Sequence, residues 1–428
     1  MEALLTRHLD ATIPLNLAAY QAIGGYCSLS AAFDLKPEKI IETVEAADLR
    51  GRGGAGFSCG LKWRLRGADA PSPRYLICNL DESEPGTFKD RYLLYGGPHQ
   101  IIEAVIVSAY ALQAERAFIF VRGEYAKGGH SLNQAIQEAE TAGLLGSSIC
   151  GSGFNLQIEV HLSGGRYICG EETAQINAIE GKRPNPRPKI PRPSTHGLWG
   201  QPTTTNNVET LVNIPHILLN GADWFRSLGV NGGCGPKLFC VSGKVRHSGL
   251  FELPCGTPAG ELIFEHAGGL DEGRTLLGFL PGGASTAFLL PEHLDLPMDF
   301  DPVAKAGSRL GTGSLIVLDD STCPVEFTLN LMRFFARESC GFCTPCRDGL
   351  PYLAQILTAI ASGEGHADDL ALLDELCATV ASQSFCAFAP GAVMPLISSI
   401  QCFHTHYEQH ITNGHCPFNT TTQGERQP

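Results

Sequence analysis

The stretch RYLICNLDESEPG, residues 74–86, joins a short apolar run to three closely spaced carboxylates. Its first seven residues have the length and composition of a buried strand. Asp81, Glu82 and Glu84 follow where that strand ends, which is the edge at which open α/β sheets bind ligands. Acidic residues in an exposed turn would give the same pattern, so both interpretations stay open for the acids, while the strand itself is expected.

Strand and helix patterns alternate after this stretch. Two further strands are expected at 117–123 and 156–163. Helices, with apolar residues three and four positions apart, are expected at 99–114 and 131–146. This alternation predicts a parallel sheet covered by helices.

Different sequence patterns flank this α/β part. Residues 180–202 are rich in proline and basic residues, so this stretch is expected to be a linker or an ordered loop along a ligand site, and neither a helix nor a central strand. From about residue 236 a short helix at 260–269 lies among short strands, which predicts a small α+β part. Those strands are expected at 237–243, 249–254, 275–283 and 313–320.

Apolar residues at helical spacing dominate the last hundred residues and predict four helices, a number that suits a small bundle. The patterns together divide the chain into five parts. These are an N-terminal segment with a glycine-rich loop (1–65), an α/β domain (66–232), an α+β domain (233–320), a helical bundle (321–410) and a polar tail (411–428).

The composition excludes some classes of protein. Of the 428 residues 43% are hydrophobic, enough for several cores, and the formal net charge of −13 argues against nucleic acid as the main partner. No apolar run is long enough for a membrane-spanning helix, and the first twenty residues lack the pattern of a secretory signal. A cytoplasmic location is therefore expected, and a peripheral subunit of a membrane complex would have the same pattern.

Cysteine is frequent but mostly scattered. Most of the 16 cysteines stand alone in apolar stretches, where cysteine usually acts as a small buried hydrophobe, so a reducing compartment is expected. The exception is Cys340, Cys343 and Cys346, a C-x-x-C-x-x-C run typical of a [4Fe–4S] cluster whose fourth ligand lies elsewhere. Structural zinc is the alternative, although zinc sites usually combine two C-x-x-C pairs or one pair with histidines.

The fourth ligand is sought among the later cysteines. Cys377 falls in the middle of an expected helix on its apolar face, which indicates packing. Cys402 lies within the last helical pattern, and Cys416 lies in the tail. Cys386 lies in an expected turn between two helices, from which its sulfur can reach the end of a neighbouring helix. Cys386 is therefore the expected ligand.

Two glycine-containing stretches offer further ligand contacts. RGRGGAGFSCGLKW, residues 50–63, contains G-x-G-x-x-G but has no clear strand before it, so it predicts a backbone that a flat or phosphorylated ligand can approach closely. Arg52 and Lys62 are expected to meet phosphate charge there. In the second stretch Gly170 precedes Glu171 and Glu172, which open a helix, where acids are also favoured by the helix dipole alone.

Taken together, these segments resemble the NADH-binding flavoprotein subunits of respiratory complex I, and look closest to the F subunits of bacterial NADH–quinone oxidoreductases. The resemblance covers nearly the whole chain, in order. It rests on LRGRGGAGFSCGLKW (49–63), CNLDESEPGTFKDRYLL (78–94), GRYICGEETAQINAIEGKRPNPRPK (165–189), TTTNNVETLVNIPHI (203–217), FARESCGFCTPCRDG (335–349) and SFCAFAPGA (384–392).

The resemblance implies a fold and an activity. The implied fold is a Rossmann-like domain that binds FMN, with an NADH cleft above the flavin, a ubiquitin-like (β-grasp) α+β domain, and a four-helix bundle with one [4Fe–4S] cluster. The implied activity is NADH dehydrogenase: FMN accepts a hydride from NADH and electrons pass singly to the cluster and on toward quinone. No catalytic side chain is expected, because the flavin carries out the hydride transfer.

The resemblance also implies site residues by motif. For FMN they are Gly51, Arg52, Gly53, Lys62, Asn79, Asp81, Glu82, Tyr167, Gly170, Glu171, Asn206 and Asn207. For NADH they are Phe57, Glu84, Glu172 and Lys189, and for the cluster Cys340, Cys343, Cys346 and Cys386. Two positions depart from the family pattern: Arg192 replaces a frequent aromatic residue, which bears on the choice between NADH and NADPH, and Cys59 replaces a frequent threonine.

The implied partners are NADH and other peripheral-arm subunits of complex I, including a small [2Fe–2S] subunit and a large iron–sulfur subunit. The implied location is peripheral, on the cytoplasmic side of the bacterial inner membrane, with no direct membrane span. Two alternatives remain: the diaphorase subunit of an NAD-linked hydrogenase or formate dehydrogenase, and a structural cluster or zinc protein that scaffolds an assembly.

Overall fold

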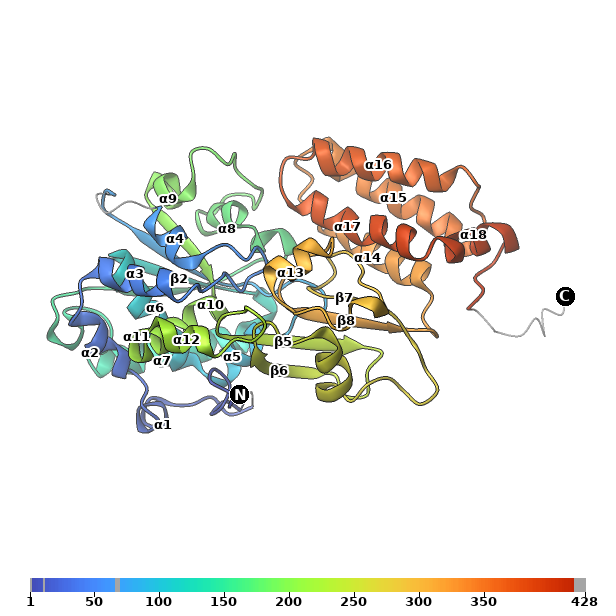
Figure 1. Ribbon diagram of the computed structural model, residues 1–428. Coiled ribbons are helices and arrows are strands. Elements are labelled where there is room, and N and C mark those ends of the chain that lie inside the picture. The colour runs from blue at the N-terminus through green and yellow to red at the C-terminus, as the bar shows by residue number, and fades with distance from the viewer. Residues whose placement is uncertain (1, 11, 66–69, 419–428) are drawn as a thin grey trace.

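The structure is a computed structural model that describes residues 2–10, 12–65 and 70–418. An α/β part with a four-stranded sheet, a second four-stranded sheet and a group of C-terminal helices lie against one another (Figure 1). The boundary expected at 65/66 adjoins residues outside the described ranges, as does the part of the expected polar tail beyond residue 418.

The first sheet is parallel throughout, with the strand order β3–β2–β1–β4. Its strands are β1 (Tyr75–Leu80), β2 (Arg116–Val121), β3 (Gln157–Leu162) and β4 (Thr203–Asn207). The three expected strands are present. β4 was not expected, because its sequence TTTNN has no apolar residue; it is nevertheless largely buried and pairs with β1.

The register of this sheet sets the position of the polar residues that follow its strands. Asn79 on β1 lies opposite Asn207 on β4, and Leu80 lies opposite Val121 on β2. The carboxyl ends of the three strands therefore share one edge, and Asp81 and Glu82 follow directly at that edge.

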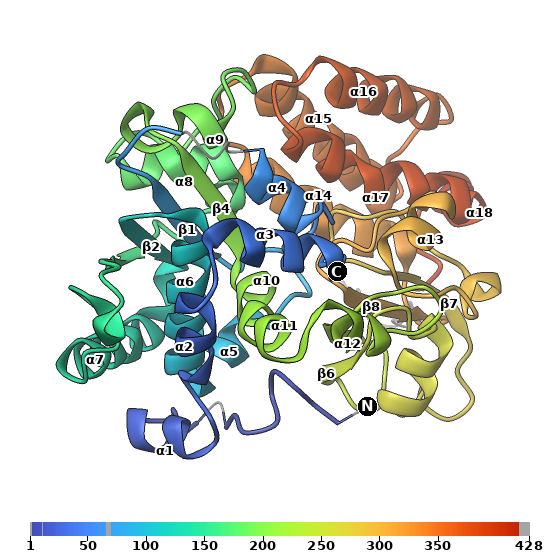
Figure 2. The ribbon, with the colours of Figure 1, turned by 60° about the vertical axis from the view of Figure 1, so that its left-hand side comes forward.

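Helices cover both faces of the first sheet. On one face Leu76, Cys78 and Ile119 belong to a core that includes α6, against which α2, α3, α7 and α11 pack (Figure 2). The helices of this part are α1 (Leu17–Ala22), α2 (Cys27–Phe33), α3 (Pro37–Ala46), α4 (Cys59–Arg64), α5 (Asp90–Gly96), α6 (Pro98–Leu112), α7 (Ala126–Thr141), α8 (Glu172–Ile179), α9 (Pro193–His196), α10 (Val208–Val212), α11 (Ile214–Asn220) and α12 (Ala222–Ser227). The expectation that 180–202 contains no helix is wrong for α9, a single turn that Pro193 begins, since proline is tolerated in a first turn.

The second sheet is mixed, with the strand order β6–β5–β8–β7. β5 and β8 are parallel, and the two outer pairs are antiparallel. Its strands are β5 (Pro236–Gly243), β6 (Gly249–Pro254), β7 (Leu276–Leu280) and β8 (Ser314–Asp319). The helix expected at 260–269 is a π-helix over Glu261–His266, and α13 (Phe300–Lys305) was not expected.

Five helices make up the C-terminal part: α14 (Pro324–Glu338), α15 (Thr344–Ser362), α16 (Asp369–Gln383), α17 (Phe388–Cys402) and α18 (His404–Asn413). The four expected helices are present. The fifth, α18, follows α17 after the single residue Phe403, and its sequence HTHYEQHITN is too polar to show a strong apolar stripe. It packs against α14, α15 and α17.

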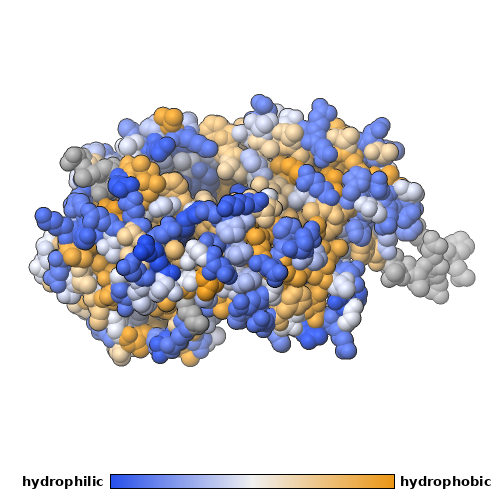
Figure 3. All heavy atoms as spheres, viewed as in Figure 1, coloured by the Kyte–Doolittle hydropathy of each residue, from blue (hydrophilic) through white to orange (hydrophobic). Residues whose placement is uncertain are grey.

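One apolar core joins the first sheet to the C-terminal helices. Ile77 and Phe120, on the face of the sheet opposite α6, belong to the same buried cluster as Met332, Leu350 and Leu396 of the helices. On the surface shown in Figure 3 hydrophilic residues are spread among apolar ones. Within the described ranges no helix combines the length and apolarity needed to cross a bilayer.

Candidate functional site

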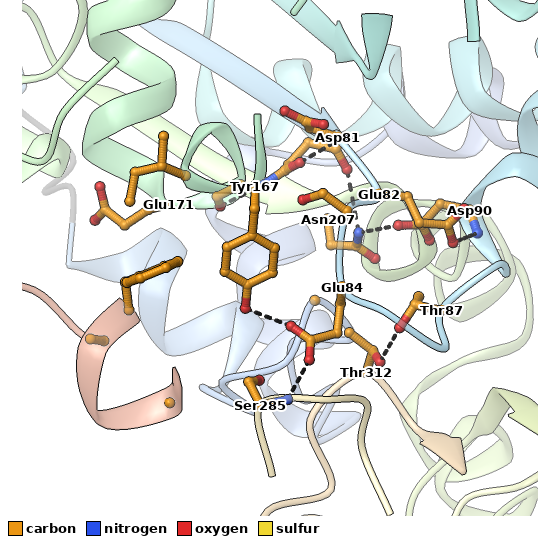
Figure 4. A pocket seen from close by; sticks show the side chains of 18 of the residues that line it. Asp81, Glu82, Glu84, Thr87, Asp90, Tyr167, Glu171, Asn207, Ser285 and Thr312 are labelled. Atoms are coloured by element: carbon orange, nitrogen blue, oxygen red, sulfur yellow. Dashed lines mark hydrogen bonds between the residues drawn. The ribbon is translucent and has the colours of Figure 1, made fainter. Parts of the chain in front are cut away.

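A cavity of about 240 Å³ lies at the carboxyl-terminal edge of the first sheet (Figure 4). All three parts of the molecule contribute walls: Asn79 and Asn207 from the first sheet, Ser285 and Thr312 from loops of the second, and Phe388 from α17. Nine of the expected cofactor residues line it, namely Gly53, Asn79, Asp81, Glu82, Glu84, Tyr167, Gly170, Glu171 and Asn207.

The floor of the cavity is a buried network of charges. The Lys89 ammonium lies 2.6 Å from Asp90 Oδ1 and 2.8 Å from Glu209 Oε2, and donates to Asn207 Oδ1 at 3.1 Å. Asn207 Nδ2 in turn donates to Asp90 Oδ2 at 2.7 Å, and Lys237 pairs with Glu209 at 2.9 Å. Because every member of the network is bonded to others, the Asn207 side chain is held in one orientation at the cavity wall.

Lys89 and Asp90 line the cavity but were not among the expected residues. The signal was present in GTFKDR, where adjacent opposite charges follow the acidic turn. The sequence alone does not show that this segment turns back beneath β4, so these charges could not be assigned to the site.

Among the carboxylates of the cavity wall, all of which the structure describes, Asp81 is the one whose oxygens accept no hydrogen bond. It is 6% exposed, and neither of its oxygens has a hydrogen-bond partner among the described residues. Burial raises the pKa of Asp81 to about 7, against smaller opposing effects of Arg122 and of the nearby Ser163 hydroxyl. A ligand that brings hydroxyl or amide donors to this wall would satisfy the group.

Glu82 has the opposite character. Its carboxylate accepts from the Asp90 amide at 2.7 Å, from Arg91 Nε at 2.9 Å and from the Tyr125 hydroxyl at 2.9 Å. These contacts tie the turn after β1 to the start of α5, so Glu82 shapes the wall rather than offering a free carboxylate.

Glu84 links the first sheet to the second part of the molecule. The Tyr167 hydroxyl donates to Glu84 Oε2 at 2.6 Å, and the Ser285 amide donates to Oε1 at 2.6 Å. Burial raises the pKa of the Glu84 carboxyl, and burial and the neighbouring Glu84 raise that of Tyr167. The Tyr167 ring also packs edge-on against Phe388 of α17, so this residue touches all three parts.

The two adjacent acids at the start of α8 have different partners. Glu171 is the N-cap: its Oε2 accepts from the amides of Thr173 at 3.0 Å and Ala174 at 2.8 Å. Glu172 forms an ion pair with Lys62 at 2.8 Å, and both side chains are about one-third exposed. Glu171 lines the cavity, whereas Glu172 and Lys62 lie outside its walls.

Seven expected cofactor residues do not line the cavity, namely Gly51, Arg52, Phe57, Lys62, Glu172, Lys189 and Asn206. The expectation that the Arg52 side chain meets phosphate charge does not match its placement, because its buried guanidinium donates to the carbonyls of Cys234 and Pro236. Lys62 likewise donates to Glu172 and to the Thr205 carbonyl. Asn206 accepts from the Trp63 indole, and Phe57 is 49% exposed.

The glycine-rich loop approaches the cavity from the side of β4. A side chain at Gly53 would place its Cβ 2.9 Å from the Asn207 Cβ, which is closer than real contacts. Gly54 pairs with Gly311 in an antiparallel bridge, so the loop also reaches the second part of the molecule. Glycine at 53 thus allows the loop to touch the side chain that the buried charges hold.

The four expected cluster cysteines come together. Cys340, Cys343, Cys346 and Cys386 all line one small cavity, together with the apolar side chains of Phe342, Phe385, Phe388 and Ile168. The run lies at the start of α15, where Cys343 is the N-cap, and Cys386 precedes α17.

The spacing of these sulfurs distinguishes a cluster from a single ion. Zinc at about 2.3 Å from each sulfur would hold them about 3.8 Å apart. Within the described part of the chain, the one group of three or more ligand side chains with all ligand atoms within 4.8 Å of one another lies elsewhere, at Cys323, His410 and Cys416. The four cysteines surround a wider space, which fits a cubane cluster better than one zinc ion.

The two cavities share a wall. Ile168 and Phe388 line both the large cavity and the one formed by the cysteines. Both are apolar, and Phe388 is 8% exposed. A group held in the first cavity is therefore separated from one held by the cysteines by little more than two side chains.

Comparison with known proteins agrees with this division. Residues 44–216 match the family model described as Nuo51 FMN-binding domain, and residues 326–410 match the one described as NADH-ubiquinone oxidoreductase-F iron-sulfur binding region. The chain is 49% identical to the F subunit of the NADH-quinone oxidoreductase of Escherichia coli (strain K12), over 96% of this chain and 93% of that protein. It is 51% identical to the corresponding F subunit of Buchnera aphidicola subsp. Acyrthosiphon pisum, over 90% and 88%.

One solved structure is similar to this chain over most of the length of this chain. A chain of NAD+-reducing [NiFe]-hydrogenase in the air-oxidized state superposes with a TM-score of 0.81 at 36% identity, covering 95% of this chain and 68% of that one.

Proposed function

Because this chain belongs to the family of NADH-quinone oxidoreductase F subunits, we propose that it is the electron-input subunit of such an enzyme, an NADH dehydrogenase with FMN and a [4Fe–4S] cluster. When bound, FMN takes two electrons together from NADH as a hydride and releases them one at a time. The protein's own contribution is to position the two groups and to keep water away from the space between them.

The observation that carries this function is the shared wall of the two cavities. The larger lies mainly within the region matched by the FMN-binding family, and the smaller within the iron–sulfur region. Ile168 and Phe388 belong to both, so electrons have a short path through apolar side chains. Lining by two buried apolar residues also keeps the path free of water.

We assign the flavin to the cavity of about 240 Å³ at the edge of the first sheet. Asn79 and Asn207 offer amides there, and the unmet Asp81 carboxylate suits donors such as the hydroxyls of a ribityl chain. Gly53 and Gly170 leave the backbone open to the ligand. The glycine loop and β4 are then held in place by four residues outside the cavity, namely Gly51, Arg52, Lys62 and Asn206. The wall of the cavity is shaped by Tyr167, Glu82 and Glu171.

Of the proposed NADH residues, Glu84 alone lines the cavity assigned to the flavin. Glu84 borders both this cavity and an adjoining one of about 540 Å³ that the glycine loop and α13 line. Phe57, Glu172 and Lys189 lie outside the walls of both, with Phe57 and Lys189 exposed. We propose that Glu172 accepts from the ribose hydroxyls of the adenosine half of NADH.

Membership of this family also supports a more detailed proposal for the domains and for the assembly. We propose that the first sheet with its helices is the Rossmann-like FMN domain, that the mixed sheet is ubiquitin-like, and that α14–α17 form the four-helix bundle of the cluster. The proposed partners are a small [2Fe–2S] subunit and a large iron–sulfur subunit in the peripheral arm, on the cytoplasmic side of the inner membrane. The relatives are themselves subunits of an oxidoreductase, which supports an assembly of several chains.

The test combines flavin, activity and electron paramagnetic resonance on purified protein. We expect bound FMN, NADH–ferricyanide reductase activity and the low-temperature signal of a reduced [4Fe–4S] centre. Cys386→Ser should lose that signal and keep the flavin, whereas the matched change Cys377→Ser, at a buried cysteine on α16, should keep both. Absence of flavin and activity in the wild type would instead favour a scaffold, and loss of the signal only in Cys377→Ser would overturn the ligand assignment.

The diaphorase subunit of an NAD-linked hydrogenase is the second candidate, because the superposed structure is such an enzyme. Its identity of 36% is lower than the 49% shared with the Escherichia coli relative, which favours the quinone-linked assembly. Mass spectrometry of the chains that co-purify with this protein separates the two.

A further inference from the structure

Three potential metal ligands meet at the far end of the C-terminal helices from the four cysteines of the cluster. They are Cys323, His410 and Cys416, whose ligand atoms all lie within 4.8 Å of one another. All three side chains are buried, with exposures of 7%, 0% and 3%. None of them takes part in either of the sites described above.

Cys323 has a backbone donor directed at its sulfur. It is the N-cap of α14, and its sulfur accepts a hydrogen bond from the Glu326 amide at 3.4 Å. The free amides and the dipole at a helix N-terminus favour negative charge on sulfur.

His410 presents the nitrogen that a metal needs. Its Nδ1 lies 2.7 Å from the His406 carbonyl, and because a carbonyl only accepts, the proton is on Nδ1. The lone pair is therefore on Nε2, which lies 3.4 Å from the Cys323 sulfur. Metal-bound histidines are oriented in this way, by a backbone carbonyl on the nitrogen that does not bind the metal.

Cys416 is brought back to the other two by the turn that ends α18. Gly414 is the C-cap in the left-handed region at φ +68°, which reverses the chain after Asn413. The turn packs against the end of α15: a Cβ at Gly363 would lie 2.0 Å from the Gly414 carbonyl oxygen. Cys416 is thus held by packing rather than left on a free tail.

We propose that Cys323, His410 and Cys416 bind a zinc ion that links the first and last helices of the C-terminal part. Thiolate and imidazole are the ligands that zinc prefers, and two thiolates with a neutral imidazole cancel the charge of the ion, which suits full burial. The three side chains leave one position of a tetrahedral zinc site open, which a water molecule would fill; His406, one turn before His410, does not belong to the group whose ligand atoms lie within 4.8 Å of one another.

The proposed ion would stabilise the helices that carry the cluster. α14 leads directly into the C-x-x-C-x-x-C run, and α18 packs on α14, α15 and α17. Because such a site forms only in the folded chain, the free energy of zinc binding adds to that of folding.

The test uses the full-length protein without an affinity tag. We expect about one zinc per chain in addition to the iron, and zinc X-ray absorption that shows two sulfurs at about 2.3 Å with nitrogen or oxygen at about 2.0–2.1 Å. Wild-type protein without zinc would overturn the proposal. So would zinc bound by four sulfurs, since that ion would occupy the four-cysteine site, or a disulfide between Cys323 and Cys416 found by non-reducing peptide mapping.

Variants identify the ligands. Cys416→Ser and His410→Ala should each lose the zinc and keep iron and flavin at wild-type levels. Cys377→Ser, at another buried cysteine of the same helices, should keep all three. Zinc retained in both Cys416→Ser and His410→Ala at the level of Cys377→Ser contradicts the assignment. If a variant does not fold, the absorption spectrum of the wild type still decides.

Discussion

Asp81 shows how a single side chain can couple ligand binding to pH. Both of its oxygens are buried and have no hydrogen-bond partner among the residues described, and burial raises its pKa to about 7. A ligand that donates hydrogen bonds to the carboxylate favours the charged form and lowers this pKa. Binding then releases a proton wherever the free protein is still protonated.

We therefore expect FMN to bind the apoprotein more tightly as pH rises from 6 to 8. The sign follows because the pKa is higher in the free than in the bound protein: about half a proton per site is released at pH 7, and the gain in affinity levels off about one pH unit above the pKa of the free protein. Calorimetry in buffers of different ionisation enthalpy measures the release. Asp81→Asn removes this contribution and leaves only that of the flavin phosphate; equal release in both proteins would contradict the assignment.

Glu172 and its neighbour test the choice of nicotinamide cofactor. A carboxylate that accepts from the ribose hydroxyls repels a 2′-phosphate, so Glu172→Gln should cost NADH about 1.5–3 kcal/mol and narrow the NADH/NADPH ratio of kcat/KM by more than tenfold. Arg192 is exposed at the start of α9. If it lies near the 2′ position of the bound ribose, it attracts a 2′-phosphate and narrows the preference for NADH, so Arg192→Phe should then reduce the use of NADPH.

Glu171→Gln is the matched comparison. Its carboxylate caps α8, so this change should lower stability by about 1 kcal/mol and leave the cofactor ratio unchanged. A ratio that shifts in Glu171→Gln and not in Glu172→Gln would exchange the two roles.

At the scale of the element, β4 and the glycine loop form one wall. β4 supplies Asn207, and the loop can touch it only because residue 53 has no side chain. The buried charges beneath β4 leave Asn207 no other orientation. The wall therefore depends on the contact between two segments far apart in sequence.

We expect Gly53→Leu to fold, keep its iron and lose its flavin, because the new side chain collides with Asn207. Gly164→Leu is the control, since a Cβ at Gly164 meets no atom within 4 Å. Flavin absorbance and iron content of both purified variants check this. Stoichiometric flavin in Gly53→Leu would mean that the loop does not contact the cofactor.

The elements differ in how far the sequence determines them. β1, β2 and β3 are apolar or alternating runs, so their positions follow from local pattern. β4 and α18 have polar sequences and exist because of what they pack against, which no local pattern records. In the same way Glu171 and Glu172 were found by motif, but only the fold shows that one caps a helix and the other pairs with Lys62.

At the scale of the whole molecule, Glu209 holds two parts together. It follows β4 on α10, yet its carboxylate pairs with Lys237 at the start of β5 and accepts from the Leu238 amide at 2.9 Å, while also pairing with Lys89. All of these charged groups are essentially unexposed. The first and second sheets are thus joined by a buried ion network.

Glu209→Gln should destabilise the protein by about 3–5 kcal/mol, because it leaves two buried ammonium groups with too little compensating charge. Glu159→Gln, which removes an exposed partner of Arg116, should cost about 1 kcal/mol or less. Denaturant unfolding of both variants gives the comparison. Similar small losses would show that the network contributes little to the free energy of unfolding.

The cavity assigned to the flavin has walls from residues as far apart as Gly53 and Gly391. During synthesis the amino-terminal part folds first, so the nascent chain forms its first sheet before the segment that bears Phe388 and Gly391 has left the ribosome. The complete pocket exists only after the last helices have docked. Cofactor loading is therefore a late step of biogenesis, and retained flavin reports that the segments that line the cavity have docked.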